Sequence, residues 1–156
     1  MSLIRRLFKS DIKRLVKNGY RVVVLGTREG LPADITQYIE TAEARSHHGK
    51  KATLAICFNY GGQEEIVRAA RRLIKRKVGA HEVTLEAFAD SIDHPEVPAC
   101  DLIVRTSGEQ RLSDFMLWRS AYSEFLFLDK YWPEMTKEDV TDILKEYTAR
   151  KRRFGG

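Results

Sequence analysis

The chain alternates short, almost uninterrupted apolar runs with stretches whose apolar residues recur at helical spacing. The apolar runs lie at residues 21–26, 53–60, 101–105 and 124–128. A strand that is apolar on both sides is buried on both faces, which is typical of parallel sheets that are covered by helices. The sequence therefore predicts an α/β fold with a parallel sheet of about four strands and helices on both faces.

The segments between these strands have the period of amphipathic helices. Asn18-Gly19 ends the first of them, and Pro32 is well suited to open the second, because its fixed φ fits the first turn of a helix. Thr84 is a candidate N-cap. The predicted helices cover residues 4–16, 32–42, 64–77, 84–92, 112–121 and 140–147.

The 156 residues have the length of one typical domain, and we expect residues 1–156 to form one. The chain carries neither an apolar run of about 18–20 residues nor a signal-peptide pattern. Cys57 and Cys100 lie in apolar contexts, which favours reduced thiols in the core. Together these features predict a cytoplasmic protein with at most peripheral contact with a membrane.

A net charge of +5 indicates an anionic partner, and nucleic acid, phosphorylated metabolites and an anionic membrane surface all fit that charge. Many of the cations lie at residues 71–77 and 150–153. Those at 71–77 share a predicted helix with a run of apolar residues, so they are expected to form its solvated face. No helix-turn-helix or RNP-like aromatic pattern is present, which disfavours nucleic acid.

Residues 105–113 gather cations and hydroxyl groups where a predicted strand gives way to a predicted helix. Ligands of α/β sheets bind at the carboxyl ends of strands, and helix N-termini attract anions. Arg105 and Arg111 can each bind phosphate oxygens with two hydrogen bonds, and Ser113 adds a hydroxyl. Gly108 would let the backbone approach the ligand. The segment predicts a diphosphate site; the alternative is a surface loop with solvated charges.

Several motifs resemble the cis-prenyltransferase family, the undecaprenyl-diphosphate synthases. The longest runs Arg105-Thr-Ser-Gly-Glu-Gln-Arg-Leu-Ser-Asp-Phe-Met-Leu-Trp118, followed by Ala121-Tyr-Ser-Glu124 and Tyr131-Trp-Pro133. Asn59-Tyr-Gly-Gly62 and Arg152-Arg-Phe-Gly-Gly156 resemble two further family motifs. The matches occur in the family's order and span nearly the whole chain.

The resemblance implies condensation of isopentenyl diphosphate with an allylic diphosphate in the presence of Mg²⁺. The family residues that match Arg105, Arg111 and Ser113 hold the isopentenyl diphosphate. The residue that matches Glu124 belongs to the metal site, although a polar residue opening an edge strand is the plain alternative. Arg153 and Gly155 match an Arg-x-Gly motif that reaches the diphosphate across a dimer interface in some members; an exposed basic tail is the alternative.

The chain also departs from the family. Members begin with a strand that leads into a His-Met-Asp-Gly-Asn-Gly-Arg-Trp-like motif, whose aspartate is essential, and this sequence contains no Asp-Gly dipeptide. Neither Asn18 nor Asn59 follows the Phe-Ser of the next family motif. Asp114 stands where asparagine is common. The resemblance is therefore to the C-terminal two-thirds of the family only, with no catalytic residue of the front motif and an incomplete Mg²⁺ site.

Two hypotheses follow. The chain is a truncated or split cis-prenyltransferase that retains the isopentenyl-diphosphate site and is inactive alone, or it is a non-catalytic subunit that binds a diphosphate or stabilises a partner. Loss of the first strands would leave an unpaired sheet edge, and such edges drive association. We therefore expect a homodimer or a complementing chain.

Overall fold

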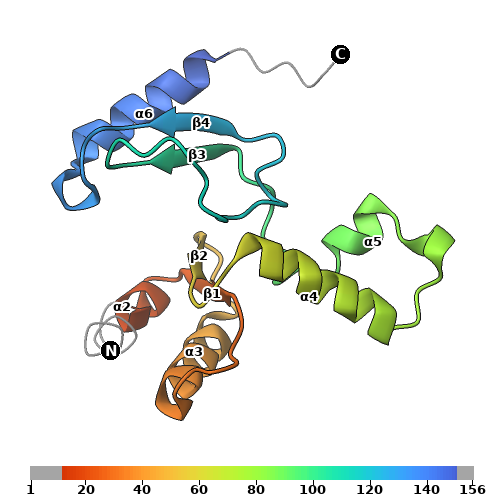
Figure 1. The fold of residues 1–156 in the computed structure, drawn as a ribbon. Coiled ribbons are helices and arrows are strands. Elements are labelled where there is room, and N and C mark those ends of the chain that lie inside the picture. Colours follow the sequence, from red (N-terminus) through yellow and green to blue (C-terminus); the bar gives the residue numbers. More distant parts are fainter. Residues whose placement is uncertain (1–11, 151–156) are drawn as a thin grey trace. The chain divides into compact units, whose positions relative to one another are not determined.

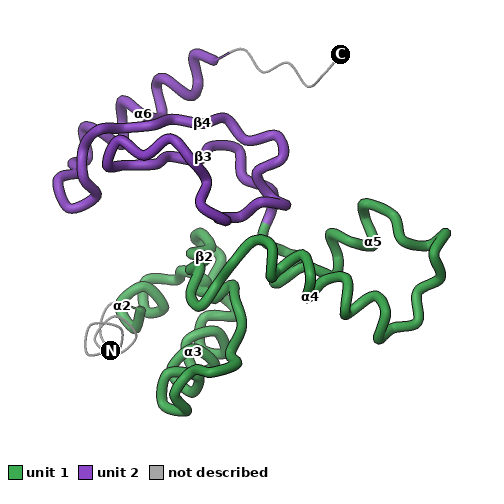
Figure 2. The backbone as a smooth tube through the Cα atoms, in the orientation of Figure 1, with its two compact units in different colours: residues 1–97 green, residues 98–156 purple. Residues whose placement is uncertain are grey.

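The computed structural model describes residues 12–150. The chain divides into two compact units, residues 1–97 and residues 98–156 (Figure 2). Each unit contains one pair of parallel strands with helices beside it (Figure 1). The α/β class with parallel strands is thus confirmed, and the four strands form two pairs, one in each unit. The organisation into a single domain stays a prediction.

The first unit is built around the parallel pair β1–β2, in which Arg21 lies beside Thr53 and Leu25 beside Cys57. Its strands lie within the predicted apolar runs, and its helices overlap the predicted amphipathic segments; residues 4–11 of the first predicted helix lie outside the described residues. A short 3₁₀ turn covers Ala80–Glu82. The elements are α2 (Ile12–Lys17), β1 (Arg21–Leu25), α3 (Ala33–Ser46), β2 (Thr53–Cys57), α4 (Gly62–Lys75) and α5 (Leu85–Ala89).

The core of the first unit lies between β1 and the helices α2 and α3. Val22 and Val24 point to one face of β1, because side chains alternate along a strand. They pack with Ile12 of α2 and with residues of α3 that recur at helical spacing. Val23 and Leu25, on the other face, are buried as well. This burial on both faces explains why the sequence of β1 is apolar throughout. The α3 residues of the core are Ile35, Ile39 and Ala42.

The helical spacing of the predicted helices 64–77 and 84–92 places Ile74 and Leu85 on their apolar inner faces. This prediction is wrong, because the two side chains are 75% and 80% exposed. Arg72 lies on the solvated face, as predicted, and is 43% exposed, but its guanidinium also donates to Asp93 at 2.6 Å and to the Ser91 carbonyl at 2.7 Å. A charged contact across some twenty residues leaves no local periodic signal, so helical spacing could not reveal it.

The second unit contains the parallel pair β3–β4, in which Leu102 lies beside Glu124 and Arg105 beside Phe127. The last helix begins with a capping box: Thr136 Oγ1 accepts from the backbone of Asp139, and the Asp139 carboxylate accepts from the backbone of Thr136. The elements are β3 (Leu102–Arg105), β4 (Glu124–Phe127), a 3₁₀ turn (Trp132–Glu134) and α6 (Lys137–Ala149).

The helix predicted over 112–121 does not form. Ser113, Asp114 and Met116 have φ values of 48°, 65° and 47°, which a right-handed helix cannot accommodate. The segment contains turn bonds, such as Phe115 N–H to the Leu112 carbonyl at 3.1 Å, and the Arg119 carbonyl accepts from the Cys100 N–H at 2.9 Å. The segment is a loop with several residues in the left-handed region. A helix N-terminus therefore does not contribute to the predicted anion site.

Two further expectations concern the membrane and the thiols. Within residues 12–150, no helix is both long enough and apolar enough to cross a membrane. Cys57 and Cys100 are both half-buried. Burial raises the pKa of the Cys100 thiol, which favours its protonated form at neutral pH.

Candidate functional site

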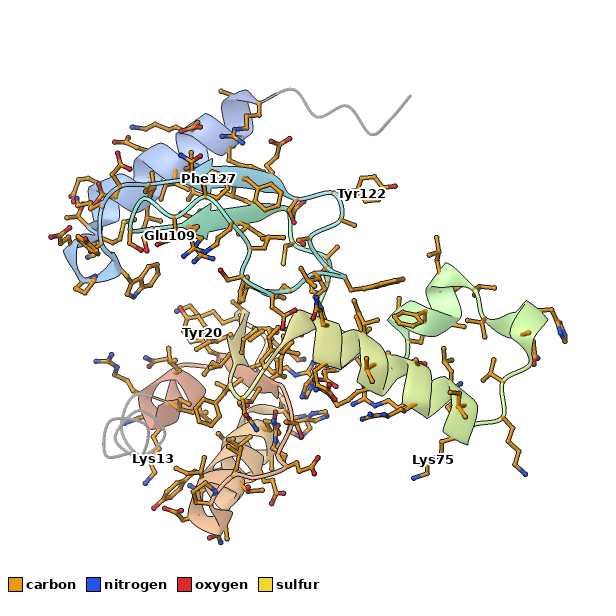
Figure 3. The ribbon with its side chains drawn as sticks, viewed as in Figure 1. Lys13, Tyr20, Lys75, Glu109, Tyr122 and Phe127 are labelled. Carbon is orange, nitrogen blue, oxygen red and sulfur yellow. The ribbon has the colours of Figure 1, made fainter. Side chains whose placement is uncertain are left out.

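The candidate site is a pocket of about 310 Å³ in the second unit, at the carboxyl end of β3. It brings together Arg105, Arg111 and Ser113, three of the residues that the sequence singled out. Residues of β3, of the loop after β3 and of β4 complete the lining. Figure 3 shows Phe127 at the end of β4. The lining residues are Ile103, Val104, Arg105, Thr106, Arg111, Leu112, Ser113, Phe115 and Phe127.

Arg105 organises the loop that forms this pocket. Its Nη1 donates to the Arg111 carbonyl at 2.5 Å and to Ser113 Oγ at 3.1 Å. These two bonds draw the loop back toward the end of β3 and help to offset the strained backbone at Ser113. An arginine carries five N–H donors, so bonds through Nη1 alone leave the guanidinium able to bind an anion as well.

Arg111 is the more exposed of the two arginines. Its side chain is 65% exposed and forms an ion pair with Glu109 of the same loop, whose position Figure 3 marks. A surface pair of this kind contributes little to stability, with a median near 0–1 kcal/mol.

Gly108 lies near this loop but outside the pocket lining. Its φ of +69° is in the left-handed region, and its N–H donates to the Leu128 carbonyl at 2.9 Å. A Cβ at this position would meet Asp129 Oδ1 at 3.4 Å, an ordinary contact. Glycine is therefore favoured at this position by the left-handed backbone conformation and not by a lack of room for a side chain. In this structure its N–H is engaged in the turn and is not presented to the pocket.

Glu124 lies apart from the pocket. The strand register places it beside Leu102, three residues before the Arg105–Phe127 pair, or about 10 Å along the strands. Its carboxylate accepts from Arg150 Nη1 at 3.0 Å. Residues 12–150 contain no group of three or more His, Cys, Asp or Glu residues that could hold a metal ion. Mg²⁺ usually takes one or two protein carboxylates and completes its octahedron with waters and phosphate oxygens, so Glu124 would supply one such carboxylate.

Two predicted site residues cannot be placed, and three residues at or near the site were not predicted from the sequence. Arg153 and Gly155 lie outside the described residues. The sequence analysis does not single out the apolar wall formed by Phe115 and Phe127, although Phe115 lies within the Arg105–Trp118 motif and Phe127 within the predicted strand 124–128. Arg150, which binds Glu124, was counted only as part of a basic run, and its ion pair spans 26 residues.

The Asn59 motif closes the carboxyl end of the β1–β2 pair in the first unit. Asn59 has a φ of 48°, and its Nδ2 donates to the carbonyls of Thr27 and Glu29, both at 3.0 Å. Gly26 has a φ of +118°, and a Cβ there would lie 2.2 Å from the Phe58 carbonyl oxygen. The motif therefore has a structural role, because it joins the two strand ends through a close backbone approach.

A buried carboxylate, Asp93, stands near the same strand end. Its Oδ2 accepts from Arg68 at 2.5 Å and from the Gly26 N–H at 3.3 Å, and its Oδ1 accepts from Arg72. Burial acts to raise the pKa of Asp93, but the hydrogen bonds and charges of the two arginines outweigh burial and lower it. Asp93 thus remains charged and ties α4 to the end of β1.

Comparison with protein families gives one match over almost the whole chain. The model described as "Putative undecaprenyl diphosphate synthase" matches residues 1–155. The isoprenyl transferase of Agrobacterium fabrum (strain C58) is 40% identical over 159 residues, which cover 99% of this chain and 64% of that protein. The chain thus spans somewhat less than two-thirds of the length of this relative.

Solved structures show the same fold. A "probable undecaprenyl diphosphate synthase" from Campylobacter jejuni superposes with a TM-score of 0.90 at 29% identity, covering 99% of this chain and 72% of that one. Lavandulyl diphosphate synthase from Lavandula x intermedia, solved with dimethylallyl diphosphate, gives the same TM-score at 30% identity, covering 100% of this chain and 70% of that one.

Proposed function

The chain belongs to the undecaprenyl diphosphate synthase family, and from that premise we propose that it binds isopentenyl diphosphate, or another diphosphate, in the pocket of the second unit. One observation carries this proposal: Arg105, Arg111 and Ser113 line a single pocket at the carboxyl end of a parallel strand. In α/β proteins this is the end at which ligands bind.

The chemistry of the pocket suits a ligand with a charged head and an apolar tail. Two guanidinium groups supply charge-assisted hydrogen bonds to phosphate oxygens, and Ser113 supplies a hydroxyl. The aromatic rings of Phe115 and Phe127 lie on the same lining. They offer apolar surface to a short hydrocarbon such as an isopentenyl group.

The proposal includes a limit on catalysis. This sequence carries no Asp-Gly motif, and residues 12–150 hold no group of three or more possible metal ligands. We propose that the chain corresponds to the C-terminal two-thirds of the family's length and that it does not complete the condensation alone. A homodimer or a complementing chain would supply what is missing.

The second candidate is a non-catalytic subunit that binds a diphosphate or stabilises a partner. The pairing of Glu124 with Arg150 supports this candidate, because it commits the family's metal-site glutamate to a contact within the chain. The DNA upstream of codon 1 distinguishes the two. An in-frame His-Met-Asp-Gly motif there supports a longer, ordinary enzyme.

Calorimetric titration with pyrophosphate tests the proposed site. Removing either arginine, as Arg105→Ala or Arg111→Ala, should weaken binding about ten- to a hundredfold, since a hydrogen bond to a charged group contributes about 1.5–3 kcal/mol. Arg71→Ala is the matched control, because Arg71 is 71% exposed on α4 and pairs only weakly, at 3.5 Å, with Glu64. Equal losses in all three variants would indicate diffuse charge attraction and would contradict the proposal.

A further inference from the structure

Arg150 holds three acceptors at the end of α6. Its Nη1 donates to Glu124 Oε2 at 3.0 Å and to the Phe125 carbonyl at 2.9 Å, and its Nη2 donates to Glu146 Oε1 at 2.6 Å. The Arg150 side chain is only 27% exposed. The planar fork of an arginine suits such a set of acceptors, whereas a lysine ammonium would not hold them in one plane.

Glu124 is the only one of these acceptors that the family resemblance assigns to a metal site. Its carboxylate is 35% exposed, and it opens β4 at the end of the strand pair opposite Arg105. No three-membered group of possible metal ligands surrounds it within residues 12–150. The contact that the structure does show is with a cation of the chain itself.

We infer that Arg150 is a positioning residue that occupies Glu124, so that a divalent cation can bind this carboxylate only by displacing the guanidinium. This inference rests on the proposed function, because it concerns the metal that the family uses. The guanidinium meets three acceptors at once, the Glu124 and Glu146 carboxylates and the Phe125 carbonyl, and a cation at Glu124 would have to replace all three bonds. Mg²⁺ also gives up its hydration water reluctantly.

The same contact joins β4 to the end of α6. Glu124 and the Phe125 carbonyl belong to β4, whereas Arg150 directly follows α6. Displacing Arg150 therefore removes this side-chain contact between α6 and β4.

Paramagnetic broadening by Mn²⁺ tests this inference on the full chain, because it detects even weak binding near an amide. We would record amide spectra of the unmutated chain, of Arg150→Ala and of the double variant Glu124→Gln/Arg150→Ala. Lys145→Ala is the matched control, since Lys145 pairs with Asp142 on the exposed face of the same helix. Arg150→Lys keeps the positive charge and serves if the alanine variant is poorly folded.

The expected result is selective broadening of the amide signals of residues 124 and 125 in Arg150→Ala, at Mn²⁺ levels that leave the unmutated chain and Lys145→Ala unchanged. The double variant should lose that broadening. Arg150→Lys should lie between the two. Broadening at Glu124 in the unmutated chain, or none in Arg150→Ala, would overturn the inference. Neither outcome touches the pyrophosphate titration, so failure of the inference and failure of the proposed function are distinguishable.

Discussion

Single residues decide how the ends of the strands are built. The sequence identified Arg105, Arg111 and Ser113 because charged and hydroxyl groups after an apolar run are conspicuous. It could not show that Arg105 uses Nη1 to hold the loop itself, since that depends on the left-handed backbone at Ser113. Asn59 was noted as part of a family motif, and its two bonds to the strand end explain its presence structurally.

The close backbone approach at Gly26 predicts how a single substitution there changes the stability of the fold. Gly26→Ala should lower the free energy of unfolding by at least about 1–3 kcal/mol, the cost of a strained backbone alone, because the new Cβ would also lie 2.2 Å from the Phe58 carbonyl oxygen. Gly30→Ala is the control: its φ of +75° is strained too, but nothing lies within 4 Å of its Cβ. Urea unfolding measures both. Equal losses would show that the close backbone approach contributes nothing.

At the scale of elements, local periodicity predicted most strands and helices but not the loop after β3. The apolar residues of 112–121 have helical spacing, yet Ser113, Asp114 and Met116 adopt positive φ. The bonds of Arg105 to this segment come from outside it, so no local pattern records them. The contact between Arg72 of α4 and Asp93 leaves no local signal for a similar reason, because Asp93 lies twenty-one residues beyond Arg72.

His94 connects α3 to the segment before β3. Its Nε2 lies 3.3 Å from Glu43, and its Nδ1 lies 3.1 Å from Glu96. The hydrogen bond to Glu43, followed by that to Glu96, raises the pKa of His94, while burial opposes the rise. Arg28 and Arg21 contact the same two carboxylates, and His47 and His48 line the neighbouring cavity.

This contact predicts a pH dependence of stability. Because the pKa of His94 is raised in the folded chain, its contribution is fully present below the unfolded value of about 6.5. The contribution is lost as the pH rises through the folded value. The difference in unfolding free energy between the unmutated chain and His94→Asn should therefore be larger at pH 5.5 than at pH 9. Asparagine tolerates the φ of 48° at this position. A difference that grows with pH in urea unfolding would contradict this assignment.

At the scale of the whole molecule, ion pairing decides which cations are available to a partner. Arg28, Arg68, Arg72 and Arg150 are all engaged in ion pairs within their units. The net charge of +5 already counts both members of each pair, so pairing leaves the overall charge unchanged but makes these guanidinium groups less available for direct contact with an anion. The pocket with Arg105 and Arg111 is then the better-defined place for an anion.

The chain alone is predicted to be inactive in condensation. Incubation with isopentenyl diphosphate, farnesyl diphosphate and Mg²⁺ should give no extended prenyl products, because the sequence lacks the aspartate motif that the family requires. Product analysis by chromatography measures this, with an active family member as the positive control. Turnover in the usual enzyme range of about 1–10³ s⁻¹ would show that the motif is dispensable.

Binding of a diphosphate at the carboxyl end of β3 is the proposal on which the others depend. Amide chemical-shift mapping with isopentenyl diphosphate locates the ligand without requiring turnover. We expect saturable shifts concentrated in residues 103–115 and at Phe127, with the Gly26–Glu29 and Asn59 amides of the first unit unchanged. Shifts centred on the first unit, or spread evenly over the basic surface, would show that the diphosphate does not bind in this pocket.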